Sequence, residues 1–289
     1  MKTRDLFPAR MALTLVTLGM ILPDGSAFAQ TAAPAIAATA IAKVPILINK
    51  PGLYLLKKDL VFTPTIGATA QAITLAAGDV TLDLGGHAIS SNAIIGDGLN
   101  TTVGIGLTPG SATHTTIRNG VLRNFNQGIR LEIIGSVSRV LIEDMFLSNS
   151  GTDGIRVQAT SIEIRRCKIV DTGWNSIISG TSGISAFGEG TTRIVDNDIS
   201  NSSYTEGYLG TGISTTSGIV ERNRVRGTLA VPGVVGISCD GKSFALDNVI
   251  SGFQTGIQAT SAAVKYRGNT TFDCMTPFSG GTAVGTENN

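Results

Sequence analysis

The sequence predicts an all-β fold, a single-domain right-handed parallel β-helix solenoid of about eight coils. Three observations support this prediction. A short Gly-Ile motif returns every 20 to 29 residues, a β-branched segment follows each copy, and the composition is rich in Gly, Ile, Val, Thr, Ser and Asn. These residue types favour short strands joined by tight turns, and fixed periods of this length are typical of solenoids.

The first 29 residues have the features of a secretory signal peptide. Lys2, Arg4 and Arg10 precede an apolar run over 11–22, and small residues stand at alternate positions in Ala27-Phe28-Ala29. We expect cleavage after Ala29 and a secreted or periplasmic protein. An uncleaved membrane anchor is the alternative, which the shortness of the apolar run disfavours.

Composition shifts divide the rest of the chain into three parts. Residues 30–43 are an Ala-rich leader, 44–275 are the predicted β-helix and 276–289 are a C-terminal tail. Without the signal peptide, basic and acidic residues are equal in number, whereas nucleic-acid binding needs a basic excess. We therefore expect no nucleic-acid partner, and no membrane partner after signal cleavage. The sequence gives no oligomeric state.

The Gly-Ile motif is the first strand of each coil. A coil cannot bury its inward side chains alone, so identical strands must stack about 4.8 Å apart. The copies are VGIGL (103–107), QGIRL (127–131), DGIRV (153–157), SGISA (182–186), TGIST (211–215), VGISC (235–239) and TGIQA (255–259), with QAITL (71–75) as a Gly-less first copy. Their isoleucines should form one inward file: Ile105, Ile129, Ile155, Ile184, Ile213, Ile237 and Ile257.

The second segment of each coil ends at a turn that contains Asn in four successive copies, with Cys167 in the same place one coil earlier. These residues are Asn197, Asn223, Asn248 and Asn269. Asn side chains can hydrogen-bond along a stack. The outward positions of this segment should form a structural ladder of charges: Arg118, Glu143, Arg165, Val195, Glu221, Asp247 and Arg267.

Other β architectures fit the repeat less well. A sandwich has no fixed period, a propeller needs about 40–50 residues for each blade, and the hexapeptide repeats of a left-handed β-helix are missing. The three cysteines allow either a Cys239–Cys274 disulfide or three separate thiols. No Cys/His ligand spacing indicates a metal site.

The chain resembles the right-handed β-helix repeat family that contains pectate lyases, polygalacturonases, alginate epimerases and NosD-like proteins. The resemblance runs from Val44 to Cys274 and is carried by VTLDLGGHAI (80–89), by NGVLRNFNQGI (119–129) and by the repeat itself. It implies a substrate groove on the outward face of one sheet. The fold alone hosts both enzymes and inert proteins.

Two arginines stand at equivalent outward positions of neighbouring copies. Arg130 and Arg156 should be stacked about one coil apart, with Glu132 or Asp153 between them to limit their repulsion. Arginine binds carboxylates in a bidentate manner, so the pair is a candidate subsite for a uronic acid. A structural Arg ladder balanced by local acids is the alternative reading.

Catalysis by these residues would be proton transfer next to a uronate carboxylate, as in a polysaccharide lyase or epimerase. GTDGI (151–155) looks like a segment of polygalacturonases that would place a catalytic acid at Asp153, but the other carboxylates and the His of that signature are missing. Asp153 could instead cap a turn. A lyase or epimerase is therefore favoured over a glycoside hydrolase. No acidic cluster supports a Ca²⁺ site, so no cofactor is expected.

Three aromatic residues fall in the longest coils and could flank such a groove, either stacking on sugar rings or covering the core edge: Trp174, Tyr204 and Tyr208. Two functions remain open at this point. The first is an exported protein that binds, and in a stronger form cleaves or epimerises, an acidic polysaccharide. The second is a non-catalytic envelope or adhesin-like structural module.

Overall fold

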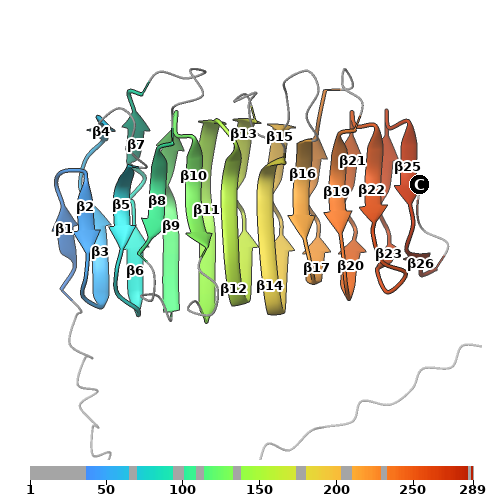
Figure 1. Cartoon of the computed structure of the whole chain (residues 1–289), viewed down its shortest axis with the longest axis horizontal. Coiled ribbons are helices and arrows are strands. Elements are labelled where there is room, and N and C mark those ends of the chain that lie inside the picture. The colour runs from blue at the N-terminus through green and yellow to red at the C-terminus, as the bar shows by residue number, and fades with distance from the viewer. Residues whose placement is uncertain are drawn as a thin grey trace, which may run out of the picture. The chain divides into compact units, whose positions relative to one another are not determined.

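The computed structural model describes residues 37–64, 70–93, 101–108, 114–132, 138–173, 180–202, 210–228, 233–285 and 288. These residues belong to one compact unit, Ile36–Asn289. Every regular element in the described ranges is a strand, and the strands lie side by side in chain order (Figure 1). No helix in these ranges is long and apolar enough to cross a membrane. The predicted signal peptide lies outside the described residues.

The strands form three stacked columns, and every pairing is parallel. The first column holds β2 (Ile46–Ile48), β5 (Gln71–Leu75), β8 (Val103–Leu107), β10 (Gln127–Glu132), the first halves of β12 (Asp153–Arg165) and β14 (Thr181–Val195), β16 (Gly210–Thr215), β19 (Val235–Cys239), β22 (Thr255–Ala259) and β25 (Thr276–Ser279).

The other two columns complete each coil. The second column holds β1 (Thr39–Ile41), β3 (Gly52–Leu56), β6 (Val80–Asp83), the first halves of β9 (His114–Arg123) and β11 (Arg139–Ser150), the second halves of β12 and β14, β17 (Gly218–Glu221), β20 (Ser243–Leu246), β23 (Lys265–Arg267) and β26 (Thr282–Ala283). The third holds β4 (Leu60–Phe62), β7 (Ala88–Ser91), the second halves of β9 and β11, β13 (Lys168–Thr172), β15 (Asp198–Ser202), β18 (Arg224–Arg226), β21 (Val249–Ser251) and β24 (Thr270–Phe272).

The predicted isoleucine file is confirmed. Ile105, Ile129 and Ile155 are direct partners in successive coils, and the file continues to Ile257 in the same register. All of its members are at most 1% exposed. Burying each isoleucine stabilises the fold by about 1.5–3 kcal/mol relative to leaving it in water. The file is the centre of a continuous core that runs the length of the stack.

The stack extends beyond the eight predicted copies and beyond the predicted range of 44–275. β2 precedes the first predicted copy and β25 follows the last. β1 lies in the segment predicted as a leader, and β25 and β26 lie in the segment predicted as a tail. These strands are short and lack the Gly-Ile motif, so the repeat pattern did not reveal them.

The glycine of the motif stands where the chain turns from the third column into the first. A Cβ on Gly154 would lie 2.7 Å from both the Gly183 carbonyl oxygen and Ile169 Cγ2. Gly154 and Ile155 therefore both face the core at this corner, and only a residue without a side chain fits between the neighbouring coil and the third column.

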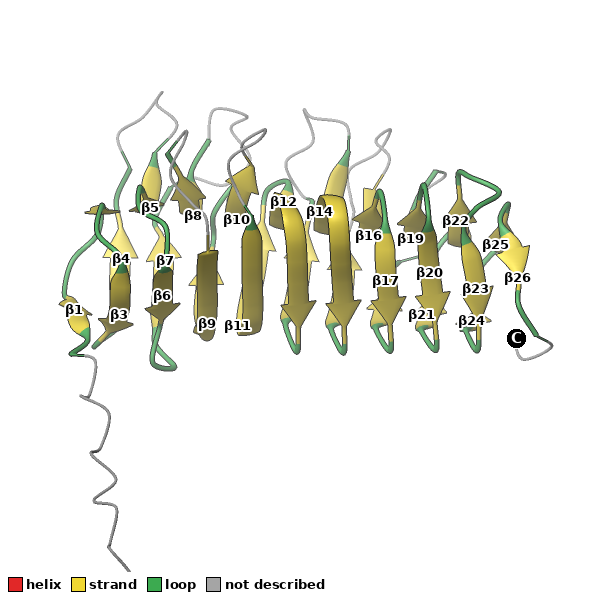
Figure 2. Ribbon diagram, turned by 90° about the horizontal axis from the view of Figure 1, so that it is seen from below, coloured by secondary structure: helices red, strands yellow, loops and turns green. Residues whose placement is uncertain are grey.

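The corner between the second and third columns is built differently. Its first residue has a positive φ in successive coils: Asp144, Arg166, Asp196, Arg222 and Asp247. Its second residue is buried and forms the predicted ladder. Asn223 Nδ2, for example, donates to Asn248 Oδ1 at 3.0 Å and to the Ile194 carbonyl at 2.8 Å. Figure 2 shows these tight turns along one edge of the stack.

The structure differs from the predicted charge ladder at one position and decides the state of the cysteines. Leu246, not Asp247, occupies the strand register opposite Glu221 and Arg267, because Asp247 has moved into the turn with a φ of 53°. The three cysteines are free thiols. Burial raises the pKa of Cys167 and of Cys239 to about 12.

Candidate functional site

The two predicted arginines meet on the outward face of the first column, on β10 and β12. Arg130 pairs with Arg156 in the strand register. Glu132 lies between their guanidinium groups, 3.3 Å from Arg130 Nε and 2.8 Å from Arg156 Nε. The Glu132 side chain is 18% exposed and the Arg156 side chain is 30% exposed, so their ion pair is partly shielded from solvent. Glu132 is thus the acid that offsets the repulsion expected between two stacked arginines.

Asp153 begins β12 beside this group and is almost fully buried, with 2% of its surface exposed. Its Oδ2 accepts a hydrogen bond from Gln127 Nε2 at 3.1 Å and lies 3.9 Å from Arg156 Nη1. Its Oδ1 is buried without a hydrogen-bond partner. Desolvation by burial raises the pKa of Asp153 to about 6, against the lowering effects of Gln127 and Arg156. Burial therefore favours the protonated form of Asp153.

The arginine group contains two further residues, Gln127 and Phe187, which the sequence analysis did not identify. Gln127 occupies the motif position of Asp153 one coil earlier, and its Oε1 accepts a hydrogen bond from Arg130 Nη1 at 3.3 Å. Phe187 occupies the register position of Glu132 two coils later, and Arg156 lies over its ring at 5.1 Å from the centroid. An alignment of the repeats by position, rather than by residue type, would have identified both.

The outward face continues past the arginines as a row of hydroxyl and amide side chains. The residues in register with Arg156 in the following coils are Ser185, Ser214, Ser238, Gln258 and Ser279. Ser185 is buried and the other four are partly exposed. No acidic side chain occupies this row. Such a face offers hydrogen-bond donors and acceptors to a polyhydroxylated ligand lying along the stack.

Other predicted site residues cannot be placed against this group. Trp174, Tyr204 and Tyr208 lie outside the described residues. Within the described ranges, no three His, Cys, Asp or Glu side chains are grouped so that they could hold a metal ion. The absence of a cofactor stays a prediction.

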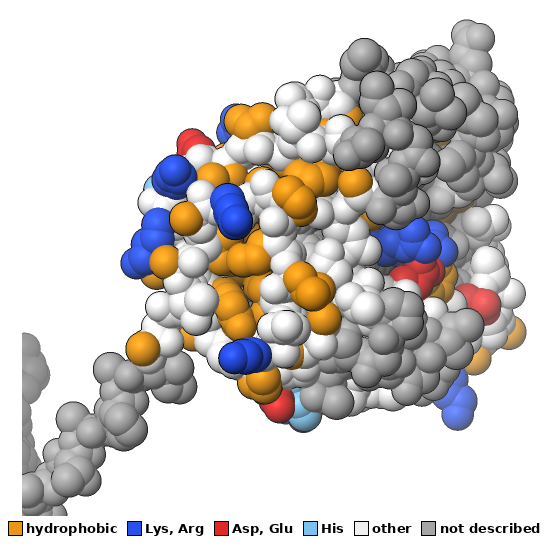
Figure 3. Space-filling view, turned by 60° about the vertical axis from the view of Figure 1, so that its left-hand side comes forward, with side chains coloured by type: hydrophobic (Ala, Val, Ile, Leu, Met, Phe, Trp, Pro, Cys, Tyr) orange, Lys and Arg blue, Asp and Glu red, His pale blue; other side chains and the backbone are white. Residues whose placement is uncertain are grey.

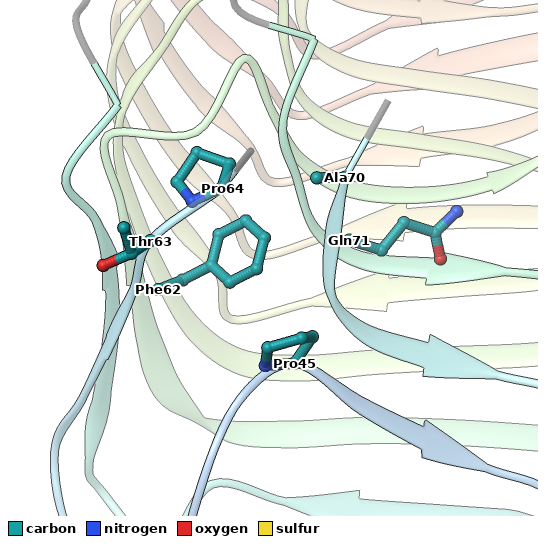
Figure 4. A pocket seen from close by; sticks show the side chains of 6 residues that line it. All are labelled: Pro45, Phe62, Thr63, Pro64, Ala70 and Gln71. Carbon is teal, nitrogen blue, oxygen red and sulfur yellow. The ribbon is translucent and has the colours of Figure 1, made fainter. Parts of the chain in front are cut away.

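A hollow of about 250 Å³ lies elsewhere, near the N-terminal end of the first column (Figure 4). Its lining consists of Pro45, Phe62, Thr63, Pro64, Ala70 and Gln71. None of these residues is charged. In the first column Gln71 pairs with Val103, which pairs with Gln127, so the hollow stands two coils away from the arginine group and supplies no acid or base to it.

The fold defines the class of protein, a parallel β-solenoid, and its first column carries the arginine group on the outward face. The family model described as "right handed beta helix region" matches residues 103–276. The chain belongs to this family. The match also assigns the right-handed sense that the sequence predicts.

The chain is similar to the A-module of a mannuronan C-5 epimerase from Azotobacter vinelandii, at 12% identity and a TM-score of 0.34, over 86% of this chain and 88% of that one. No curated protein matches. The family and the geometry of the arginine group therefore remain as the basis for a function.

Proposed function

We propose that this protein is exported and binds an acidic polysaccharide along the outward face of the first column. The single observation that supports this most is the pair of stacked arginines with a protonatable carboxyl beside them. Arg130 and Arg156 would hold a uronate carboxylate, since guanidinium groups bind carboxylates in a bidentate manner. The partly exposed hydroxyl and amide side chains of the same row, from Ser214 onward, would hydrogen-bond the neighbouring sugars.

The arginine group keeps donors that a bound anion could use. Glu132 uses the Nε atoms of both arginines, which leaves other guanidinium N–H groups to face solvent: Arg130 and Arg156 are 45% and 30% exposed. A buried carboxyl with a pKa of about 6 is also suited to proton transfer. Lyase or epimerase chemistry would require Asp153 to reach a sugar C–H bond.

One observation favours the second function, a non-catalytic structural module. The Arg130–Glu132–Arg156 group is already paired within itself, as a structural charge ladder would be. The two functions differ in whether the arginines contact a ligand.

Binding and chemistry can be tested separately on alginate, pectate and glucuronan. We expect retention of the full chain on at least one immobilised polyuronate, and loss of that retention in the Arg130→Ala, Arg156→Ala double variant. Arg118→Ala, Arg193→Ala is a matched control that removes equal charge from the second column. A rise in ultraviolet absorbance would reveal a lyase product. Equal retention of both double variants, or none by the wild type, would reject the site.

A further inference from the structure

The first complete coil, residues 43–64, has an outward surface unlike that of the next coil. Its outward strand positions are apolar on all three columns, and each is paired with a polar residue one coil later. The pairs are Leu47 with Thr74, Leu53 with Thr81, Leu55 with Asp83 and Val61 with Ser90. Leu47 is 56% exposed and Val61 is 66% exposed. These four apolar residues form a ring around the N-terminal end of the stack.

Lysines stand at the turns between these apolar positions. The four are Lys43, Lys50, Lys57 and Lys58, and all are exposed. Asp59 is the one acidic residue of the segment and lies 3.2 Å from His87. Among the described residues none of these lysines has an ion-pair partner, whereas arginines further along the stack are paired with acids. We call the four apolar residues and the four lysines the N-terminal girdle.

Figure 3 looks on to this end of the solenoid, where hydrophobic side chains gather and basic side chains lie around them. Apolar side chains ringed by lysine suit a bilayer interface. The apolar groups enter the acyl boundary, while lysine stems extend to anionic headgroups. From this arrangement we infer that the N-terminal girdle docks the end of the solenoid on an anionic phospholipid surface. The inference does not depend on the proposed polysaccharide site, and it departs from the expectation of no membrane partner.

The alternative occupant, a second copy stacked end to end, fits the girdle less well. Such stacking would pair the open backbone edges of the terminal strands. It would leave the outward leucines and Val61 in water, because these side chains point away from the solenoid axis. A bilayer surface contacts the ring from outside and also supplies negative charge for the lysines.

Vesicle flotation tests the inference with the protein purified from cells that express the full chain. We expect binding to vesicles of phosphatidylglycerol mixed with phosphatidylcholine, and none to phosphatidylcholine alone. A lysine near an anionic surface strengthens binding by about fivefold, so Lys57→Gln, Lys58→Gln should weaken it by about 25-fold. Lys242→Gln, Lys265→Gln makes the same charge change at the far end and should have no effect.

A second measurement reports the depth of the girdle. A tryptophan introduced by Leu47→Trp should shift its emission to shorter wavelength on the anionic vesicles, relative to the parent chain, whereas one introduced by Ser238→Trp should not. Equal binding to both kinds of vesicle, equal effects of the two lysine double variants, or matched shifts of the two tryptophans would overturn the inference. So would self-association in sedimentation that Leu47→Ser, Val61→Ser abolishes, because the ring would then bind a second copy.

Discussion

Replacing Glu132 by Gln tests the proposed subsite most directly, because it removes the carboxylate that occupies the space between the two arginines. Above the Asp153 pKa of about 6, two guanidinium charges are balanced by the carboxylates of Glu132 and Asp153. The variant leaves the group with one net positive charge. A uronate bound there should therefore bind more tightly.

The expected gain follows from Coulomb's law. Two unit charges 4 Å apart interact by about 1 kcal/mol in water and about 4 kcal/mol at an effective dielectric constant of 20. Glu132 is 18% exposed and Arg130 is 45% exposed, so the lower half of that interval applies. A gain of about 1–2 kcal/mol corresponds to roughly 5- to 30-fold in affinity. The fold should lose about 1 kcal/mol, because Arg130 and Arg156 lose the negative charge that both of them pair with.

Titration calorimetry with alginate and pectate oligomers measures the gain. Glu163→Gln is the matched control, since Glu163 pairs with Arg165 at 3.0 Å on the second column and carries the same charge. Tighter binding in Glu132→Gln alone is the expected result. If Glu132→Gln binds no better than Glu163→Gln while remaining folded, a carboxylate does not occupy the space between the arginines.

Three further predictions concern stability. Burial raises the pKa of Asp153 from 3.8 to about 6, so the folded state holds this proton more tightly than the unfolded state does. Wild-type stability should therefore fall by about 2 kcal/mol as the pH rises from 4 to 6. Urea titrations across that pH range should show no such fall in stability for Asp153→Asn. The same fall in the variant would exclude Asp153 as its source. Asn223→Leu should cost about 3–5 kcal/mol, because two donors of Asn197 and the Ile194 carbonyl lose a buried partner; a loss below 1 kcal/mol would contradict the ladder's role. Gly154→Ala should cost about 1–3 kcal/mol by overpacking, measured against Ser214→Ala as a near-neutral control; equal unfolding midpoints would refute the corner geometry.

The sequence predicted the stack well because its period determines the register. Once Ile129 and Ile155 share a file, Arg130 and Arg156 must be neighbours, and Glu132 must lie within their reach. The register of the repeat was therefore sufficient to predict this half of the site.

The burial of Asp153 could not be predicted in the same way. Strict alternation fails at its corner, because Gly154 and Ile155 both face the core. Only the three-dimensional structure shows that Asp153 is buried next to Gln127, its partner in the neighbouring coil. The positive φ values of Arg166 and Arg222 were equally hidden, since arginine has no intrinsic preference for that conformation. Their ion pairs with Asp144 and Asp196, each 2.8 Å, help to hold it.

The asparagine ladder has a consequence for how this protein can change its length. From β12 onward, the second and third columns are always joined by two residues, as between Arg165 and Lys168 or between Glu221 and Arg224. An insertion there would misalign the amides above and below it. The connections from the third column back to the first vary from three to eight residues between β13 and β25. The chain can therefore accept longer loops beside the first column, next to the arginines. The two-residue corners between the second and third columns meanwhile maintain the register of the coils.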